Sequence, residues 1–547
     1  MNTKTSKKSN ILGQAVRAAL LLASLPAVSM ADVGDLVLTS SFYAGTATPI
    51  FPGVTKLPGA NSTTTVLATN DGTYPTVFGN NAKDASFGIT SPIFISTVNS
   101  RTGNIVDNYN LTDIASKLGI NIVTSFPSKS ELAINQSTDN KALTLMAYAT
   151  TSGLLDISNS NTPGLNVDTT NPTYGFSAPT YRAVVQINSD GSLKVTNTNA
   201  YSGNNGRAAI LNTATNKYFM VGNAGNSGKP APSATIISQL SDNTGVQTIT
   251  PGSSSANTTV IGQTQGTTGN ATGYQHGFSV ALINPVTNAA YGPADKTGKD
   301  DNFRGLTVFK NTLYVTKGSG GNGINTVYQV GAVGGFNNLD GNSTISILPG
   351  LPTDLASGTP TDYPFGIWFA NDHTLYVANE GDGSLTNAIN PAKTANFGLQ
   401  KWVLNDADSK WHNVYTLQNG LNIGVNYTVS GTVGHVAGSY TAATDGLRNL
   451  AGRVNGDGTV TLFAVTSTVS TNTDVGADPN KLVSITDVIS ATNPGREHFT
   501  TLQTAAYGQV FRGVSLYNGS CLGHETIEKA SNPALCQHGK ATFAAYQ

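Results

Sequence analysis

Residues 302–321 read NFRGLTVFKNTLYVTKGSGG, and residues 363–383 repeat the phrase as YPFGIWFANDHTLYVANEGDG. In both copies two short runs of alternating apolar and polar residues flank a polar turn, which predicts a β-hairpin. After the first copy, residues 324–333 and 343–350 predict a third and a fourth strand. Four antiparallel strands repeated every ~60–80 residues are typical of the blades of a β-propeller.

Weaker copies of this unit occur along the rest of the chain. The first strand of each unit is predicted to start near residues 131, 206, 303, 364, 447 and 511. The unit at 511 has only its first strand, and residues 34–45 and 91–111 read as its second, third and fourth strands. Joining the two ends of the chain in one blade would close the ring and remove exposed sheet edges.

The sequence therefore predicts an all-β fold: a single β-propeller of six or seven four-stranded blades, closed by its N- and C-terminal strands. A weak preference for seven rests on chain length, since propellers of ~500 residues often have room for a seventh blade, although residues 250–300 could hold only part of one. Three connections, at 44–88, 155–180 and 250–300, are longer than ordinary loops, and such loops are either functional or flexible.

The phrases LYVTKGSGG (313–321) and LYVANEGDG (375–383) resemble the second strand and turn of YVTN/NHL-type β-propellers of secreted bacterial proteins. The resemblance is strong over residues 302–383 and diffuse over most of the mature chain. It implies a propeller with a central channel, and it implies no single activity, because the fold hosts both binding proteins and enzymes.

Few residues of this chain are charged. Charged residues make up 11% of the sequence, against roughly 25% in an average soluble protein, and the net charge is −1. No broad basic face for nucleic acid is expected. A surface with few carboxylates should change little with pH, which suits an exposed or acidic setting, although many secreted β proteins share this composition.

The N-terminus has the pattern of a signal peptide. Lys4, Lys7 and Lys8 precede an apolar stretch at 11–28, and Ser29-Met30-Ala31 fits a cleavage site. We expect a signal peptide at 1–31, a propeller at 32–520 and a tail at 521–547, with no later membrane span. The protein should be exported, to the periplasm or to the extracellular space or cell surface.

The two cysteines, Cys521 and Cys536, lie in the predicted tail. In an oxidising compartment such a pair predicts a disulfide bond. A metal site with the neighbouring His524 and His538 is the alternative, but the spacing matches no standard zinc motif.

Arginine occurs at matching positions before or within four of the six predicted first strands. First strands line the channel of a propeller, so these side chains should gather at one mouth as a ligand-binding ring of Arg207, Arg304, Arg448 and Arg512. The planar guanidinium group suits carboxylates, phosphates and sulfur oxyanions. The alternative is structural: each arginine would hydrogen-bond carbonyl groups of the neighbouring blade.

Acidic residues lie near the same strand starts and loop ends, and the candidates for a general base are Asp300, Asp301 and Glu380. Together with Asp382 and Asp445 they could neutralise the arginines, bind a divalent cation such as calcium, or activate water. No cofactor is predicted, since the sequence has no haem-attachment, P-loop, nucleophile-elbow or zinc-protease motif.

Three functions remain open from the sequence. The first is an exported binding protein whose channel mouth accepts a small anionic ligand or an acidic surface. The second is a secreted, acid-tolerant hydrolase of an anionic substrate, either a sulfur oxyanion such as a polythionate or a phosphate ester. The third is a structural cell-surface protein. The sequence leaves the oligomeric state open.

Overall fold

The computed structural model describes residues 34–59, 64–82, 87–225, 233–262, 301–318, 323–354, 356, 361–471 and 475–516. The predicted signal peptide, Asp300, Cys521 and Cys536 lie outside these residues, so those predictions stay open. Among the described residues, no helix combines the length and apolar character needed to cross a membrane.

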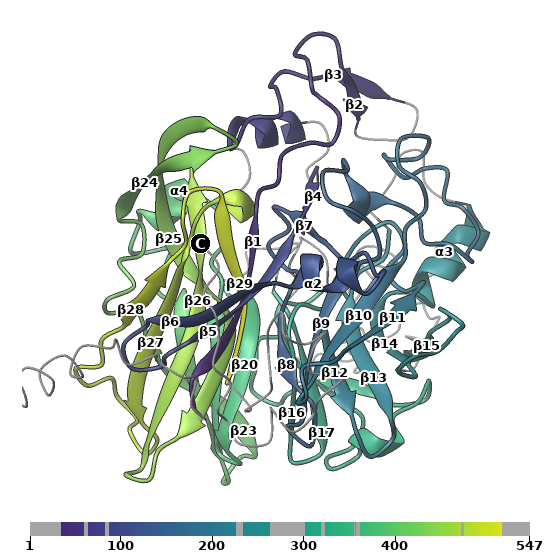
Figure 1. The fold of residues 1–547 in the computed structure, drawn as a ribbon. Helices are drawn as coiled ribbons and strands as arrows, with labels where there is room; N and C mark the ends of the chain where they lie inside the picture. The colour runs from purple at the N-terminus through teal and green to yellow at the C-terminus, as the bar shows by residue number, and fades with distance from the viewer. Residues whose placement is uncertain are drawn as a thin grey trace, which may run out of the picture.

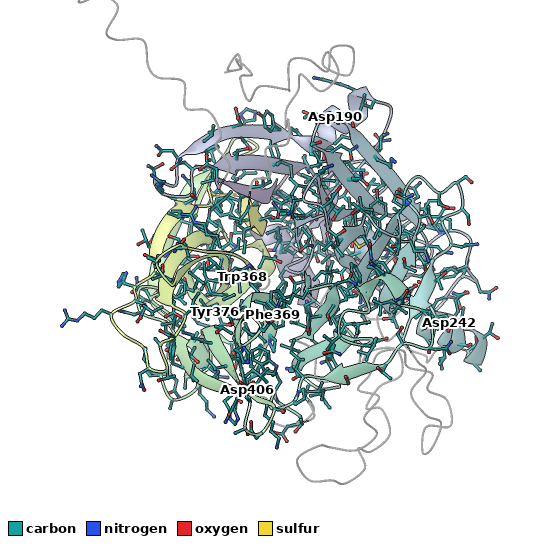
Figure 2. All side chains as sticks on the ribbon, turned by 90° about the horizontal axis from the view of Figure 1, so that it is seen from below. Asp190, Asp242, Trp368, Phe369, Tyr376 and Asp406 are labelled. Atoms are coloured by element: carbon teal, nitrogen blue, oxygen red, sulfur yellow. The ribbon has the colours of Figure 1, made fainter. Side chains whose placement is uncertain are left out.

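Six antiparallel sheets stand in a ring, which confirms the predicted all-β propeller (Figures 1 and 2). From the channel outward, blade 1 contains β29 (Gln509–Leu516), β1 (Leu36–Phe42), β5 (Ile93–Val98) and β6 (Ile105–Asn110). Blade 2 contains β8 (Asn135–Gln136), β9 (Ala142–Tyr148), β10 (Arg182–Asn188) and β11 (Leu193–Thr198). Blade 3 contains β12 (Gly206–Asn212), β13 (Lys217–Gly222), β14 (Gly245–Ile249) and β15 (Thr259–Ile261).

The remaining blades follow the repeated phrase. Blade 4 contains β16 (Leu306–Phe309), β17 (Thr312–Lys317), β18 (Thr326–Val330) and β19 (Ile345–Ile347). Blade 5 contains β20 (Pro364–Asn371), β21 (Thr374–Asn379), β22 (Gly398–Asn405) and β23 (Lys410–Leu417). Blade 6 contains β25 (Val436–Val454), β26 (Thr459–Ser470), β27 (Lys481–Val488) and β28 (Thr500–Thr504), and β24 (Asn426–Val433) pairs with the first half of β25.

The weak preference for seven blades is wrong. The innermost strands β12 of blade 3 and β16 of blade 4 contact each other directly, so no blade lies between them. Arg207 of β12 also donates a hydrogen bond to the carbonyl oxygen of Phe303, just before β16, at 2.7 Å. The described residues therefore form a ring of six blades.

Both ends of the described chain meet in blade 1, as predicted. β1 pairs with β29 in antiparallel register from Leu36 opposite Leu516 to Phe42 opposite Gln509.

The predicted hairpin turn in residues 302–321 is also confirmed. Lys310 and Asn311 have φ values of 45° and 56°, as a two-residue turn between right-twisted strands requires.

A threonine on the second strand joins neighbouring blades at several positions. The Thr316 hydroxyl accepts a hydrogen bond from the Gly305 amide at 2.9 Å and donates to the Phe365 carbonyl of the next blade at 2.6 Å. The Thr39 hydroxyl likewise accepts from the Gly513 amide and donates to the Leu132 carbonyl, at 2.6 and 2.7 Å. Each hydroxyl therefore satisfies groups of two adjacent innermost strands.

These bridges require the innermost strands to lie very close together. A Cβ atom on Gly305 would lie 2.2 Å from the Phe365 carbonyl oxygen, and one on Gly513 would lie 2.3 Å from that of Leu132. Such contacts exclude any side chain. The Arg-Gly pairs at 304–305 and 512–513 are therefore explained in part by packing, since glycine is the residue that permits a close backbone approach.

The described parts of the connections between β1 and β5 and between β6 and β8 lie on the face of the ring where the innermost strands begin (Figure 1). This face carries the hairpin of β2 (Lys56–Pro58) and β3 (Thr65–Leu67), the pair β4 (Ile89–Ser91) and β7 (Thr124–Phe126), and β24. We call this face the loop-bearing mouth of the channel.

The helical segments of the described chain are short. They are η1 (Thr76–Ala82), α2 (Leu111–Lys117), η2 (Ile157–Asn159), α3 (Ala234–Ser241), η3 (Phe336–Asn338), α4 (Leu385–Ala388) and η4 (Val475–Ala477).

The bridging hydroxyl makes a testable contribution to stability. Thr316→Val keeps the shape of the buried side chain but leaves the Gly305 amide without its acceptor, so we expect the free energy of unfolding to fall by about 1–3 kcal/mol. Thr307→Val is the matched control, because the half-buried Thr307 hydroxyl lies in the same blade and bonds no described residue; its effect should stay within about 0.5 kcal/mol. Urea unfolding of both variants measures the difference, and equal effects would contradict the bridging role.

Candidate functional site

The four predicted arginines all lie at the loop-bearing mouth, but they do not line an open funnel. Their exposed fractions are 3% for Arg207, 7% for Arg304, 4% for Arg448 and 3% for Arg512. Each side chain is therefore almost wholly enclosed, and its partners decide its role.

Two of them hold neighbouring blades together. Besides its bond to the Phe303 carbonyl, Arg207 donates through Nε to the Asn205 amide oxygen at 3.1 Å. Arg512 donates to the Gly476 carbonyl in blade 6 at 2.9 Å. These contacts match the structural alternative raised by the sequence.

Arg304 and Arg448 instead meet around Glu380. The Glu380 Oε2 atom accepts from Arg448 Nε at 3.1 Å and lies 3.2 Å from Lys129 Nζ. Arg304 donates to the Ser130 hydroxyl and acts on both Glu380 and Arg448 through its charge. We call Lys129, Arg304, Glu380, Asp445 and Arg448 the axial charge cluster.

The axial charge cluster spans the channel. Lys129 lies in the segment that leads into β8 of blade 2, and Glu380 follows β21 of blade 5, so their ion pair joins opposite blades of the six-membered ring. Arg304 enters from blade 4, while Asp445 and Arg448 belong to β25 of blade 6. Only residues at the channel axis can be reached from four blades at once.

Two glycines allow the acidic residues to approach each other. A Cβ atom on Gly381 would lie 2.2 Å from Asp445 Oδ2, and Gly381 has a φ of +80°. A Cβ atom on Gly446 would lie 2.3 Å from the Asn379 carbonyl oxygen. The turn after β21 therefore packs against an irregularity of β25 between Thr444 and Leu447, where the register with β26 shifts.

Positive charge controls the ionisation of Glu380. Burial alone would raise the pKa of this carboxyl, but Lys129, Arg448 and Arg304 together outweigh burial and hold the pKa below its usual value. Burial lowers the pKa of Arg304; Glu380 opposes this effect and Arg448 reinforces it. The cations therefore repel one another, and the negative charge of one ionised carboxylate does not balance their positive charge.

Asp445 behaves in the opposite way. Burial, with smaller contributions from Asp382 and Glu380, raises the pKa of Asp445 to about 7, although the Gly383 amide donates to its Oδ2 atom at 2.8 Å. The side chain is 1% exposed. The cluster therefore contains one carboxyl group held ionised beside another that is protonated below neutral pH.

Three buried atoms of the axial charge cluster have no hydrogen-bond partner among the described residues. They are Arg304 Nε, Glu380 Oε1 and Asp445 Oδ1. Buried polar atoms are almost always bonded in native proteins, so each marks a place where a ligand or water would find a donor or an acceptor. Lys129, whose side chain is 29% exposed, connects the cluster to solvent.

The other acidic candidates lie elsewhere or have other roles. Asp301 is fully buried and accepts from the Thr244 hydroxyl at 3.3 Å. Asp382 shapes the turn after β21 by accepting from the Ser384 amide at 2.8 Å. No group of three or more His, Cys, Asp or Glu side chains suited to a metal ion occurs in the described part of the chain. A calcium site remains a prediction.

Sequence reasoning missed Lys129 because this residue does not occupy the arginine position of the repeat. Leu132 occupies it in blade 2, since its carbonyl accepts the bridging threonine hydroxyl as the Phe365 carbonyl does in blade 5. Sequence reasoning also missed Arg182, whose guanidinium donates to the carbonyl oxygens of Ser158, Ser160, Thr180 and Asn204. Arg182 is the first residue of β10, the third strand of blade 2, and its hydrogen bonds hold the long connection 155–180 in place.

The high pKa of Asp445 predicts a pH-dependent stability. Because the folded pKa of about 7 lies above the ordinary value of 3.8, the stability it contributes is fully present below about pH 4 and is lost as the pH rises to about 7. Asp445→Asn cannot ionise, so its unfolding free energy relative to the parent should rise across this window, by at most ~1.4 kcal/mol per pH unit.

Chemical unfolding at several pH values measures this difference, with Asp190→Asn as the control because Asp190 is an exposed carboxylate in the turn between β10 and β11. A difference between Asp445→Asn and the parent that does not vary between pH 4 and pH 8 would show that Asp445 ionises normally.

Comparisons with known proteins give no family for this chain. No protein-family model matches it, and no curated protein sequence matches it. Solved structures that resemble it include the parainfluenza virus 5 hemagglutinin-neuraminidase ectodomain, with 10% identity, a TM-score of 0.30 and coverage of 93% of this chain and 95% of that one. The same viral protein with the ligand DANA at pH 7.0 matches with 8% identity, a TM-score of 0.27 and coverage of 78% and 84%. These likenesses are too weak to carry an argument, so the fold assignment rests on the strand pairing.

Proposed function

We propose that the chain is an exported β-propeller that binds a small anionic ligand at the loop-bearing mouth, through the axial charge cluster. One observation supports this most: three cations, Lys129, Arg304 and Arg448, surround the single carboxylate Glu380. Export rests on the signal-peptide pattern of residues 1–31.

The physical argument is charge balance in an enclosed site. Removing several cations from water costs free energy unless each is paired, and the pKa values of Lys129 and Arg304 are lowered for this reason. An anion placed beside Lys129 would offset the excess positive charge. Arg304 Nε and Lys129 supply N–H donors suited to the oxygen atoms of a carboxylate, phosphate or sulfur oxyanion.

Lys129→Met tests the binding proposal, because it removes the partly exposed cation and keeps the aliphatic part of the side chain. We expect affinity for the bound anion to fall at least about tenfold, the loss of one charged hydrogen bond. Phosphate, sulfate, tetrathionate and citrate are the probes, and calorimetry is the measurement. Lys141→Met is the control, since Lys141 is exposed in the turn between β8 and β9, away from the cluster.

Binding that survives Lys129→Met would place the anion site elsewhere. If none of the four anions binds the parent protein, the binding proposal is wrong and a structural role at the cell surface is favoured.

A second function, hydrolysis of an anionic substrate, is supported by the contrast between Glu380 and Asp445. Two carboxyl groups whose environments push their pKa values apart are a recurring arrangement for acid and base catalysis. In this proposal Glu380 accepts a proton from water as the water attacks the substrate, and protonated Asp445 gives a proton to the leaving group. Lys129 and Arg304 hold the anionic substrate.

The hydrolase proposal predicts turnover of a phosphate ester or tetrathionate with an optimum below about pH 7, where Asp445 is protonated. Glu380→Gln and Asp445→Asn should each lower kcat by roughly 100-fold or more, as expected for loss of a general acid or base. Lys129→Met should chiefly raise KM. Anion binding without turnover by the parent protein would reject hydrolysis and leave the binding proposal intact.

A further inference from the structure

A cavity of about 470 Å³ lies along the channel, between the axial charge cluster and the mouth opposite the loops. Its lining residues follow the strand starts in each blade: Gly305 comes directly after Arg304, and Asn449 directly after Arg448. The axial charge cluster therefore lies at the inner end of the cavity. The volume falls within the ~300–1,000 Å³ that is usual for small-molecule sites.

The wall of this cavity is polar but almost uncharged. None of its described lining residues is acidic, and the one cation, Lys310, pairs with Asp372 at the exposed rim. Away from the inner end, a charged ligand would find no opposite charge on this wall to compensate its loss of water. The cavity is therefore suited to a neutral ligand.

Three amide side chains supply oriented acceptors in the wall. Asn135, Gln136 and Asn449 use their amide N–H groups to bond the carbonyl oxygens of Ala209, Leu516 and Arg512, at 3.1, 3.0 and 2.7 Å. These bonds to neighbouring innermost strands fix the direction of each side chain. The three amide oxygens accept no hydrogen bond from a described residue, so they offer oriented acceptors to a ligand.

Donors and an aromatic surface complete the wall. Trp368 is half-buried, lines the cavity and uses its indole N–H in no bond to a described residue. Figure 2, which views the ring from below, places Trp368 nearer the centre than Asp406 of the same blade. The indole packs over Gly452, where a Cβ atom would lie 2.6 Å from the Trp368 ring. The hydroxyls of Thr307 and Ser515 also face no described partner.

We propose that this cavity binds a neutral polyhydroxylated ligand, a mono- or disaccharide. Sugar hydroxyl groups would donate to the three amide oxygens and accept from the Trp368 N–H, while an apolar sugar face would lie on the indole. The site is separate from the proposed anion site, because the axial charge cluster stands between the cavity and the loop-bearing mouth.

Tryptophan fluorescence tests this proposal directly. The chain has three tryptophans, and Trp402 and Trp411 are each only 6% exposed, so a ligand in the channel should change mainly the emission of Trp368. Glucose, galactose, maltose and cellobiose are added at millimolar concentration to the full-length protein, and saturation-transfer NMR detects binding independently. At least one of these sugars should shift the emission, and Trp368→Phe should abolish the shift.

Thr307→Tyr should fill the cavity and weaken sugar binding by at least about tenfold, the loss of ~1.4 kcal/mol. Thr428→Tyr is the matched control, because Thr428 is exposed on β24 outside the cavity. Thermal unfolding confirms that both variants fold, and Lys129→Met should leave sugar binding unchanged.

Three results would overturn the proposal. The first is that no sugar binds by either method, which indicates a channel filled by solvent only. The second is that spermidine binds and the sugars do not, which indicates that the amide oxygens form a cation site. The third is sugar binding that Thr307→Tyr leaves intact.

Discussion

The pairing of β29 with β1 is the constraint on which the rest of the structure depends. These strands come from the two ends of the described chain, and together they complete blade 1. Without β29, blade 1 would lack its innermost strand, and both β1 and the neighbouring strand β8 would lose a partner. Every position at the channel axis is set by six innermost strands held in one ring, so the axial charge cluster exists only when this closure is made.

The ring places charged groups where charges are costly. Lys129 and Glu380 reach each other from opposite blades, and Arg448 and Arg304 add positive charge at the same point. A buried ion pair is weak evidence for stability, because the loss of water offsets the attraction. The buried pair of Lys401 and Asp487 differs, since the Lys401 ammonium also donates to the Tyr415 hydroxyl and to the carbonyls of Val488 and Ala491. That network is fully bonded and joins blades 5 and 6. The axial charge cluster instead keeps three atoms that bond no described residue, which is why we propose an anion site there.

The repeated phrase predicted the architecture well because strand period, turn chemistry and glycine spacing are local properties of a sequence. The Lys310-Asn311 turn and the blade shared by both ends follow from them. The site was only half predictable. Arg304, Arg448 and Glu380 lie close together, as their shared location near strand starts indicated. Whether an arginine points to the channel axis or bonds a carbonyl group, however, depends on the neighbouring blade. Arg207 and Arg512 bond such carbonyls, and Lys129 lies outside the arginine position of the repeat, which Leu132 occupies in blade 2.

A disulfide between β1 and β29 tests the closure most directly. Phe42 and Gln509 are opposite each other in the β1–β29 register, and antiparallel partners lie ~4.5–5.5 Å apart at Cα, which a disulfide can span. Phe42→Cys and Gln509→Cys, introduced together with Cys521→Ser and Cys536→Ser, should form an intramolecular bond after mild oxidation, detected as one cross-linked peptide by mass spectrometry. If both introduced cysteines stay free thiols in the folded protein, β29 does not pair with β1, and the closed six-bladed ring is wrong.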